Sequence, residues 1–263
     1  MRPVVEIMWA DFVFVALDQI INQAANVRYL NRSTLSAPMT IRMQQGVTPG
    51  SCAQHSQSIE AILAHVPGIK VGMPSTPQDA YSMLRAAIAD PDPTIIIESR
   101  SLYQEVGPVV PGGLLESAEG AKAHAKGSDI ALITWGPMLQ SAMAARDQLA
   151  EHGISASVLD LRWLRPLDEK AIIDIVRESG GRAVVVHAAT RIGGFGAEVA
   201  TLINEHLFAE LVSPVVRLAT PEVRMPSAPS LQAVLVPDAD TITRAALEAV
   251  RVPPHADRVS LAY

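Results

Sequence analysis

Residues 69–98 read IKVGMPSTPQDAYSMLRAAIADPDPTIIIE, and this stretch contains the pattern that decides the fold. Its two ends, residues 69–73 and 94–98, are short apolar runs that are typical of buried strands. Between them, Thr76-Pro77-Gln78-Asp79 combines a capping threonine, a proline at the first helical position and an acid three residues after the cap. A strand, a helix and a second strand in this order predict a parallel sheet with helices on its faces.

The same alternation extends along the chain in both directions. Upstream, we expect strands at 3–8 and 39–42, one helix that starts at Asp11 as its N-cap, and another that starts at Ser58. Downstream, the strands expected are 129–134, 155–160, 182–187 and 215–218, and the helices expected are 137–151, 167–178, 197–208 and 238–250. Both halves of the chain therefore have the pattern of an α/β domain.

Residues 105–127 interrupt the alternation. They contain Pro108, Pro111 and Gly112-Gly113, so we interpret them as a linker. We therefore expect an α/β protein of two doubly wound domains with mainly parallel sheets, one at residues 1–104 and the other at 128–263. Because the first strand begins almost at Met1 with no unit before it, we expect the first domain to be incomplete at its N-terminus.

Composition excludes several classes of protein. Hydrophobic residues make up 49% of the 263 residues and charged residues 18%, which is typical of a folded chain. A net charge of −6 argues against a surface for nucleic acid or an anionic membrane. The longest uncharged run, residues 130–145, is too short to span a membrane, and Glu6 and Asp11 interrupt any signal peptide. With Cys52 as its one cysteine, the protein is expected to be soluble and cytoplasmic.

His55 is the strongest single candidate for chemistry. It lies between a glycine-containing loop and a predicted helix start, where α/β proteins place ligand-binding groups, and imidazole exchanges protons near neutral pH. The alternative is that His55 and Ser56 only satisfy backbone groups at the helix entry. Gly193-Gly194-Phe195-Gly196 also precedes a helix, but it lacks the spacing of a phosphate-binding loop, so tight packing of helix on strand explains it better.

Longer segments carry a family resemblance. They are PVVEIMWADF at 3–12, DQIINQAA at 18–25, AQHSQSIEA at 53–61, HVPGIKV at 65–71, PSTP at 74–77, DLR at 160–162 and GGFGAEVA at 193–200. In this order they resemble the β subunit of 2-oxo acid dehydrogenase E1 components, the family of the pyruvate, branched-chain 2-oxo acid and acetoin dehydrogenases. The resemblance implies a pyrimidine-binding, transketolase-like domain followed by a transketolase-type C-terminal domain.

This resemblance also implies an activity, cofactors and partners. The chain would act with an E1 α subunit in an α2β2 heterotetramer that has β–β contacts. The complex would use thiamine diphosphate to decarboxylate a 2-oxo acid, and would transfer the acyl group to a lipoyl-bearing E2. Thiamine diphosphate would be shared between the subunits, with Mg2+ on the α side, so the isolated chain is expected to be inactive and to bind the cofactor weakly.

Several positions correspond to functional residues of the family. Phe12 matches the aromatic residue that packs on the cofactor's aminopyrimidine ring, and His55 matches the histidine assigned to substrate binding or acyl transfer. The family's structural potassium site maps onto Ala37, Met39, Thr40, Ala87, Asp90 and Asp92. The family's essential glutamate lies upstream of the strand at 3–8, and this sequence starts too late to include it. Two alternatives therefore stay open: a non-catalytic β-like assembly partner, and another thiamine-dependent enzyme of the transketolase type.

Overall fold

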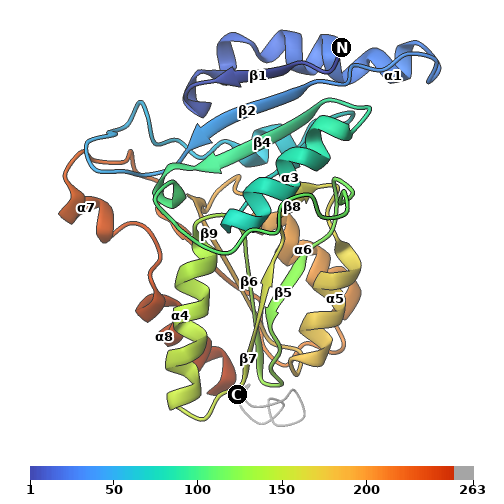
Figure 1. Cartoon of the computed structure of the whole chain (residues 1–263). Coiled ribbons are helices and arrows are strands. Elements are labelled where there is room, and N and C mark those ends of the chain that lie inside the picture. Colours follow the sequence, from blue (N-terminus) through green and yellow to red (C-terminus); the bar gives the residue numbers. More distant parts are fainter. Residues whose placement is uncertain (252–263) are drawn as a thin grey trace. The chain divides into compact units, whose positions relative to one another are not determined.

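Two five-stranded sheets form the framework of the chain, and a computed structural model describes them over residues 1–251 (Figure 1). Each sheet is mainly parallel, and helices alternate with strands along the sequence. The expected α/β class is therefore confirmed. Within the described residues, no helix is both long enough and apolar enough to cross a membrane.

The first sheet has the strand order β1-β2-β4-β3-β8. Its members are β1 (Val4–Ile7), β2 (Thr40–Gln45), β4 (Thr94–Ser99), β3 (Lys70–Gly72) and β8 (Trp163–Arg165). The first four are parallel, and β8 pairs with β3 in the antiparallel direction. The order places the carboxyl ends of β1, β2 and β4 next to one another, so the loops that follow these strands lie along one edge.

Helix α3 (Pro77–Ala89) forms as its sequence predicts. Thr76 is its N-cap, and the threonine hydroxyl accepts a hydrogen bond from the Asp79 amide at 3.1 Å. On its inner face, Met83 and Ala87 pack on Ile96 of β4 in a small apolar cluster. This packing explains why the segment between the two quoted strands is a single regular helix.

The segment after β1 differs from the one helix expected there. It forms a series of short helices: the 3₁₀ helix η1 (Ala10–Val15), the π-helix η2 (Gln19–Gln23), the 3₁₀ helix η3 (Ala24–Asn26) and a short α1 (Val27–Leu30). Trp9 is the N-cap residue of η1, and it makes no side-chain capping bond. Asp11 is not a cap, because its carboxylate is buried inside the turn and bonds to a distant part of the chain. Three further short helices lie elsewhere along the chain: α2 (Glu60–Ala64), η4 (Arg100–Leu102) and α7 (Pro229–Ala233).

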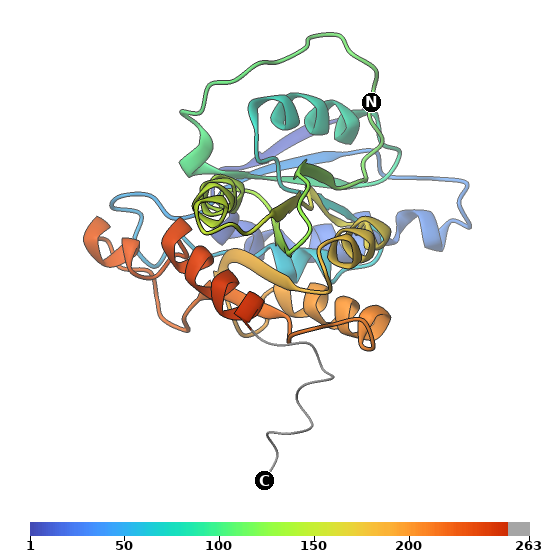
Figure 2. The ribbon, with the colours of Figure 1, turned by 90° about the horizontal axis from the view of Figure 1, so that it is seen from below.

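The second sheet has the order β10-β9-β6-β7-β5. Its strands are β10 (Val216–Thr220), β9 (Ala183–Thr190), β6 (Ile130–Thr134), β7 (Ala156–Asp160) and the antiparallel edge strand β5 (Lys122–Ala125). Helices α4 (Met138–Glu151) and α8 (Ala239–Arg251) pack on each other against one face, while α5 (Glu169–Glu178) and α6 (Gly196–Leu207) cover the other (Figures 1 and 2). Buried side chains of β6, β7 and β9 form the core beneath α4 and α8.

The chain divides into two compact units, and it crosses between them more than once. Unit 1 contains residues 1–120, 162–168 and 223–235, and unit 2 contains residues 121–161, 169–222 and the described residues from 236. The domain boundaries 1–104 and 128–263, with a linker at 105–127, stay a prediction, and residues 252–263 lie outside the described part. Strand β5 falls inside the segment that we interpreted as a linker.

Candidate functional site

His55 lies between two aromatic side chains at the carboxyl edge of the first sheet. Its ring centroid is 4.6 Å from that of Trp9 and 5.5 Å from that of Phe12, and both pairs meet edge to face. Trp9 and Phe12 come from the turn that follows β1, and His55 comes from the loop that follows β2. The structure thus brings together the two residues that the family resemblance selects, Phe12 and His55. Because 48% of Phe12 is exposed, one side of this pair is open to a ligand.

Asp11 connects the two loops that carry these aromatic groups. Its Oδ1 accepts a hydrogen bond from the backbone N–H of Gln57 at 3.0 Å, two residues after His55. The side chain is only 7% exposed, and its Oδ2 has no hydrogen-bond partner among the described residues. A buried charge-assisted hydrogen bond of this kind limits the motion of the His55 loop against the turn after β1. Sequence reasoning missed this role, because the alternation of strands and helices does not show that the strands before these two loops are neighbours.

Gln45, the last residue of β2, joins the start of the His55 loop to its end at Ile59 and Glu60. The Gln45 amide donates to Glu60 Oε2 at 2.8 Å, and its oxygen accepts from the N–H of Ile59 at 2.9 Å. Both side chains are buried. Ser56 adds a bond from its hydroxyl to the carbonyl oxygen of Cys52. The loop between β2 and α2 is therefore fixed at both ends, which positions the imidazole.

Arg100 is a further charged residue at this site that the sequence did not indicate. It directly follows β4, and its guanidinium carbon lies 4.1 Å from the ring centroid of Trp9. Its Nη1 donates to Thr48 Oγ1 at 3.0 Å. The Trp9 ring thus contacts a cation as well as His55. The strand order explains the arrangement, because β4 is the neighbour of β2.

The residues that match the family's potassium site come from two neighbouring segments. They are Ala37, Met39, Thr40, Ala87, Asp90 and Asp92. β2 and β4 are paired with Thr40 opposite Thr94, and the N–H of Thr94 donates to the carbonyl oxygen of Met39 at 3.0 Å. This pairing places the segment before β2 beside the segment that joins α3 to β4. Sequence positions about fifty residues apart therefore lie on adjacent segments.

Basic side chains contact both acidic residues of this set. Lys70 Nζ lies 2.5 Å from Asp90 Oδ2, and Arg28 Nε lies 2.6 Å from Asp92 Oδ1. Arg2 Nη1 donates hydrogen bonds to two backbone carbonyl oxygens, that of Ile88 at 3.1 Å and that of Asp90 at 2.6 Å. Two carbonyl oxygens that converge on one cationic nitrogen are suited to a hard monovalent cation. Such an ion would compete with the guanidinium of Arg2 for these oxygens.

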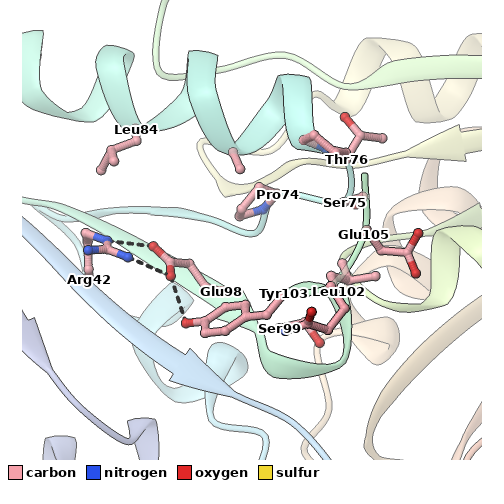
Figure 3. A pocket seen from close by; sticks show the side chains of 13 residues that line it. Arg42, Pro74, Ser75, Thr76, Leu84, Glu98, Ser99, Leu102, Tyr103 and Glu105 are labelled. Carbon is pink, nitrogen blue, oxygen red and sulfur yellow. Dashed lines mark hydrogen bonds and ion pairs between the residues drawn. The ribbon is translucent and has the colours of Figure 1, made fainter. Parts of the chain in front are cut away.

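A pocket of about 480 Å3 lies beside the N-terminus of α3, where β3 and β4 end (Figure 3). On one wall, Arg42 donates two hydrogen bonds to the Glu98 carboxylate at 2.6 and 2.9 Å, and the Tyr103 hydroxyl donates a third at 2.9 Å. Partial burial and the bond to Glu98 raise the pKa of the Tyr103 phenol. None of the candidate catalytic, cofactor-binding or metal-binding residues selected from the sequence lines this pocket.

His187 of unit 2 explains why residues 193–196 are rich in glycine. The imidazole is fully buried and stacks on Trp135 with ring centroids 5.2 Å apart. Burial, followed by the charge of Arg217, lowers the pKa of His187 to about 4. A Cβ atom at Gly194 or Gly196 would lie 2.6 or 2.5 Å from the imidazole carbons. The glycines are therefore needed for close packing against this histidine. This agrees with the prediction that they serve helix packing and do not form a phosphate-binding loop.

Comparisons with known proteins match both halves of the chain. Residues 1–106 match the family "Transketolase, pyrimidine binding domain", and residues 119–242 match the family "Transketolase, C-terminal domain". A solved structure titled "Split gene transketolase, inactive beta4 tetramer" superposes with a TM-score of 0.74 and covers 95% of this chain and 76% of its own. Its identity is 20%, so this likeness shows the fold alone.

Relatives of known name match nearly the whole chain. The 2-oxoisovalerate dehydrogenase subunit beta of Bacillus subtilis (strain 168) is 38% identical over 250 residues, which are 94% of this chain and 76% of that protein. The mitochondrial pyruvate dehydrogenase E1 component subunit beta-2 of Oryza sativa subsp. japonica is 39% identical, with coverages of 95% and 67%. The acetoin:2,6-dichlorophenolindophenol oxidoreductase subunit beta of Cupriavidus necator is 35% identical, with coverages of 95% and 74%.

Proposed function

Because this chain belongs to the family of E1 β subunits of 2-oxo acid dehydrogenase complexes, we propose that it works with an α subunit to decarboxylate a 2-oxo acid and to pass the acyl group to a lipoyl domain. The observation that carries the proposal is the imidazole of His55, which lies between Trp9 and Phe12 at the carboxyl edge of a pyrimidine-binding domain. This edge is where open α/β sheets bind their ligands.

Phe12 is the residue proposed to contact the cofactor. Its half-exposed ring offers an apolar face on which the aminopyrimidine of thiamine diphosphate can pack. When bound, thiamine diphosphate supplies the electron sink that makes loss of the carboxyl group possible. The diphosphate and Mg2+ are assigned to the α subunit, so this chain alone should hold only part of the cofactor.

His55 is proposed to handle the proton of the acyl-transfer step. A neutral imidazole donates a hydrogen bond at one ring nitrogen and accepts one at the other, so it can orient the substrate carbonyl or exchange a proton with the lipoyl thiol. Asp11 and Gln45 accept hydrogen bonds from the N–H groups of Gln57 and Ile59, which holds the loop on the C-terminal side of His55 and limits the orientations of the ring. A fixed imidazole beside an exposed aromatic face is consistent with a site that a second polypeptide completes.

Exposed apolar side chains beside this site support an obligate partner. Val5, Met8, Phe14 and Val15 are all at least 40% exposed, and all lie in β1 or directly after it. Monomeric proteins rarely expose a group of large apolar side chains without a partner. We assign this region to contacts within an α2β2 heterotetramer. Contact with a lipoyl-bearing E2 and a cytoplasmic location stay predictions.

The potassium site is also kept as a proposal. The carbonyl oxygens of Ile88, in the last turn of α3, and of Asp90, the first residue after it, bond to a single cationic position, which Arg2 occupies. Of these two residues only Asp90 belongs to the set that matches the family's potassium site. A potassium ion held there would stabilise the loop that joins α3 to β4 in place of that guanidinium, and it would take no part in the chemistry.

The proposed function can be tested with the chain co-expressed with its α subunit. We expect His55→Ala to lower reductive acylation of a lipoyl domain by about 100-fold or more. His152→Ala, which removes an exposed histidine of unit 2, is the matched control and should leave the rate unchanged. Calorimetry should show weak thiamine diphosphate binding to the isolated chain. Full acylation by the His55 variant would remove this residue from the mechanism, and a wild-type complex without turnover would favour a non-catalytic partner.

A further inference from the structure

Arg100 lies beside the proposed catalytic histidine and has no role in the proposed function. Its guanidinium stacks over Trp9, whose ring contacts His55, and it donates one hydrogen bond, to the hydroxyl of Thr48. The residue is only partly exposed. Within residues 1–251, no carboxylate lies at ion-pair distance from it. A half-buried positive charge therefore lies next to the proposed catalytic histidine without a compensating negative charge.

Some other arginines of unit 1 bond to backbone carbonyl oxygens and not to carboxylates, among them the partly exposed Arg85 and Arg165. Arg100 differs from these two in that its guanidinium lies on Trp9, whose ring contacts His55. Arg28, Arg42, Lys70 and Arg162 all form ion pairs with acidic side chains at 3.0 Å or less. Burial of a charge is costly unless the charge is paired, so an unpaired guanidinium at a binding site indicates an anionic ligand. The stacking on Trp9 lowers the cost only in part.

The geometry leaves the remaining donors of Arg100 available. A guanidinium has five N–H groups in one plane, and stacking on an aromatic ring uses only its face. With one N–H bonded to Thr48, the others can still donate in the plane. Two parallel N–H groups match the two oxygens of a carboxylate, and such a paired contact is among the stronger hydrogen-bonding arrangements in proteins.

We propose that Arg100 binds the carboxylate of the 2-oxo acid substrate and so sets the selectivity of the site for acids. This inference rests on the proposed function, because the substrate enters through it. Trp9 orients the guanidinium, and Thr48 fixes its rotation, so that the carboxylate is held near His55. The carboxylate is the group that leaves as CO2, so Arg100 contributes to substrate binding and not to the later transfer of the acyl group.

The test measures substrate oxidation by the co-expressed complex, with pyruvate or 2-oxoisovalerate as substrate and 2,6-dichlorophenolindophenol as electron acceptor. Arg100→Met should raise KM about 10- to 100-fold, because a charge-assisted contact is lost, and it should change kcat by less than about threefold. Arg100→Lys keeps the charge without the planar fork, and should give an intermediate KM. Oxidation of the matching aldehyde, which lacks the carboxylate, should be the same in all variants.

Arg85 provides a matched control. Its guanidinium also lies over an aromatic ring, that of Tyr81 at 5.2 Å, and it donates to a backbone oxygen, but it is part of α3. Arg85→Met should therefore leave KM unchanged. Arg224 is the competing cation, because it is exposed and donates to Gln57 near His55.

Each outcome decides a separate point. An unchanged KM in Arg100→Met, with an active wild type, would overturn this inference and leave the proposed function intact. A rise in KM for Arg224→Met alone would overturn it in the same way. An equal loss with acid and aldehyde would show that Arg100 only supports the structure, which also overturns it. A wild-type complex that oxidises neither acid would overturn the proposed function and this inference with it.

Discussion

Replacement of Gly196 by alanine should destabilise unit 2 through a clash with His187. The added Cβ would lie 2.5 Å from the imidazole Cδ2, 2.6 Å from Nε2 and 3.3 Å from Cγ1 of Val185. The imidazole cannot move away easily, because it is fully buried and stacked on Trp135. Overpacking of a closed core costs about 1–3 kcal/mol, against which the better helix propensity of alanine regains less than 1 kcal/mol. We expect a net loss of about 1–2 kcal/mol.

Calorimetric melting of the purified chain measures this loss. At roughly 2–4 °C per kcal/mol for a chain of this size, Tm should fall by about 2–8 °C. Gly113→Ala is the control, because a Cβ there would meet only the carbonyl oxygen of Val110 at 3.8 Å. In a His187→Ala background the alanine at 196 should cost much less, because the ring it strikes is gone. An equal cost in both backgrounds would refute the argument that the histidine requires the glycine.

Three further predictions concern single side chains. The pKa of His187 is lowered from 6.5 to about 4, so as the pH falls the unfolded chain takes up a proton before the folded chain does. The free energy of unfolding should therefore fall by about 3 kcal/mol from pH 6.5 to pH 4. Urea midpoints should show a weaker pH dependence in His187→Gln. Asp11→Ala should cost about 1–3 kcal/mol and speed hydrogen exchange at the Gln57 amide, whereas Asp11→Asn, which keeps an acceptor, should cost less. Arg2→Ala should make Tm rise more in KCl than in NaCl, and equal Tm values in the two salts would argue against a potassium site.

Elements with local signals could be predicted from the sequence. Helix α3 has a cap, a proline and an acid within four residues, and all three act within its own first turn. Strands β4 and β6 are continuous apolar runs that only a sheet covered on both faces can bury. For such elements the residues that determine the structure are the residues of the element itself, so no knowledge of the rest of the fold is needed.

Elements that depend on distant partners could not be predicted in this way. The helix expected after Asp11 is divided into short 3₁₀, π and α helices, and the carboxylate expected to cap it bonds to an amide 46 residues away. Strands β5 and β8 are three or four residues long, and each is defined by antiparallel pairing at a sheet edge. Short edge strands have no periodicity of their own, because only one neighbour and the edge position make them strands.

The candidate site depends both on local sequence signals and on contacts between distant parts of the chain. The position of His55 after a strand and before a helix is a local signal that made it a candidate, and the family resemblance was needed to assign it a role. Its surroundings depend on the strand order β1-β2-β4, which alternation along the sequence does not reveal, because alternation predicts parallel strands but not which strands are neighbours. That order brings the loops after these three strands together, and with them Trp9, His55 and Arg100. If β3 were the neighbour of β2, the arginine that follows β4 would lie one strand farther away and could not stack on the tryptophan that contacts the histidine.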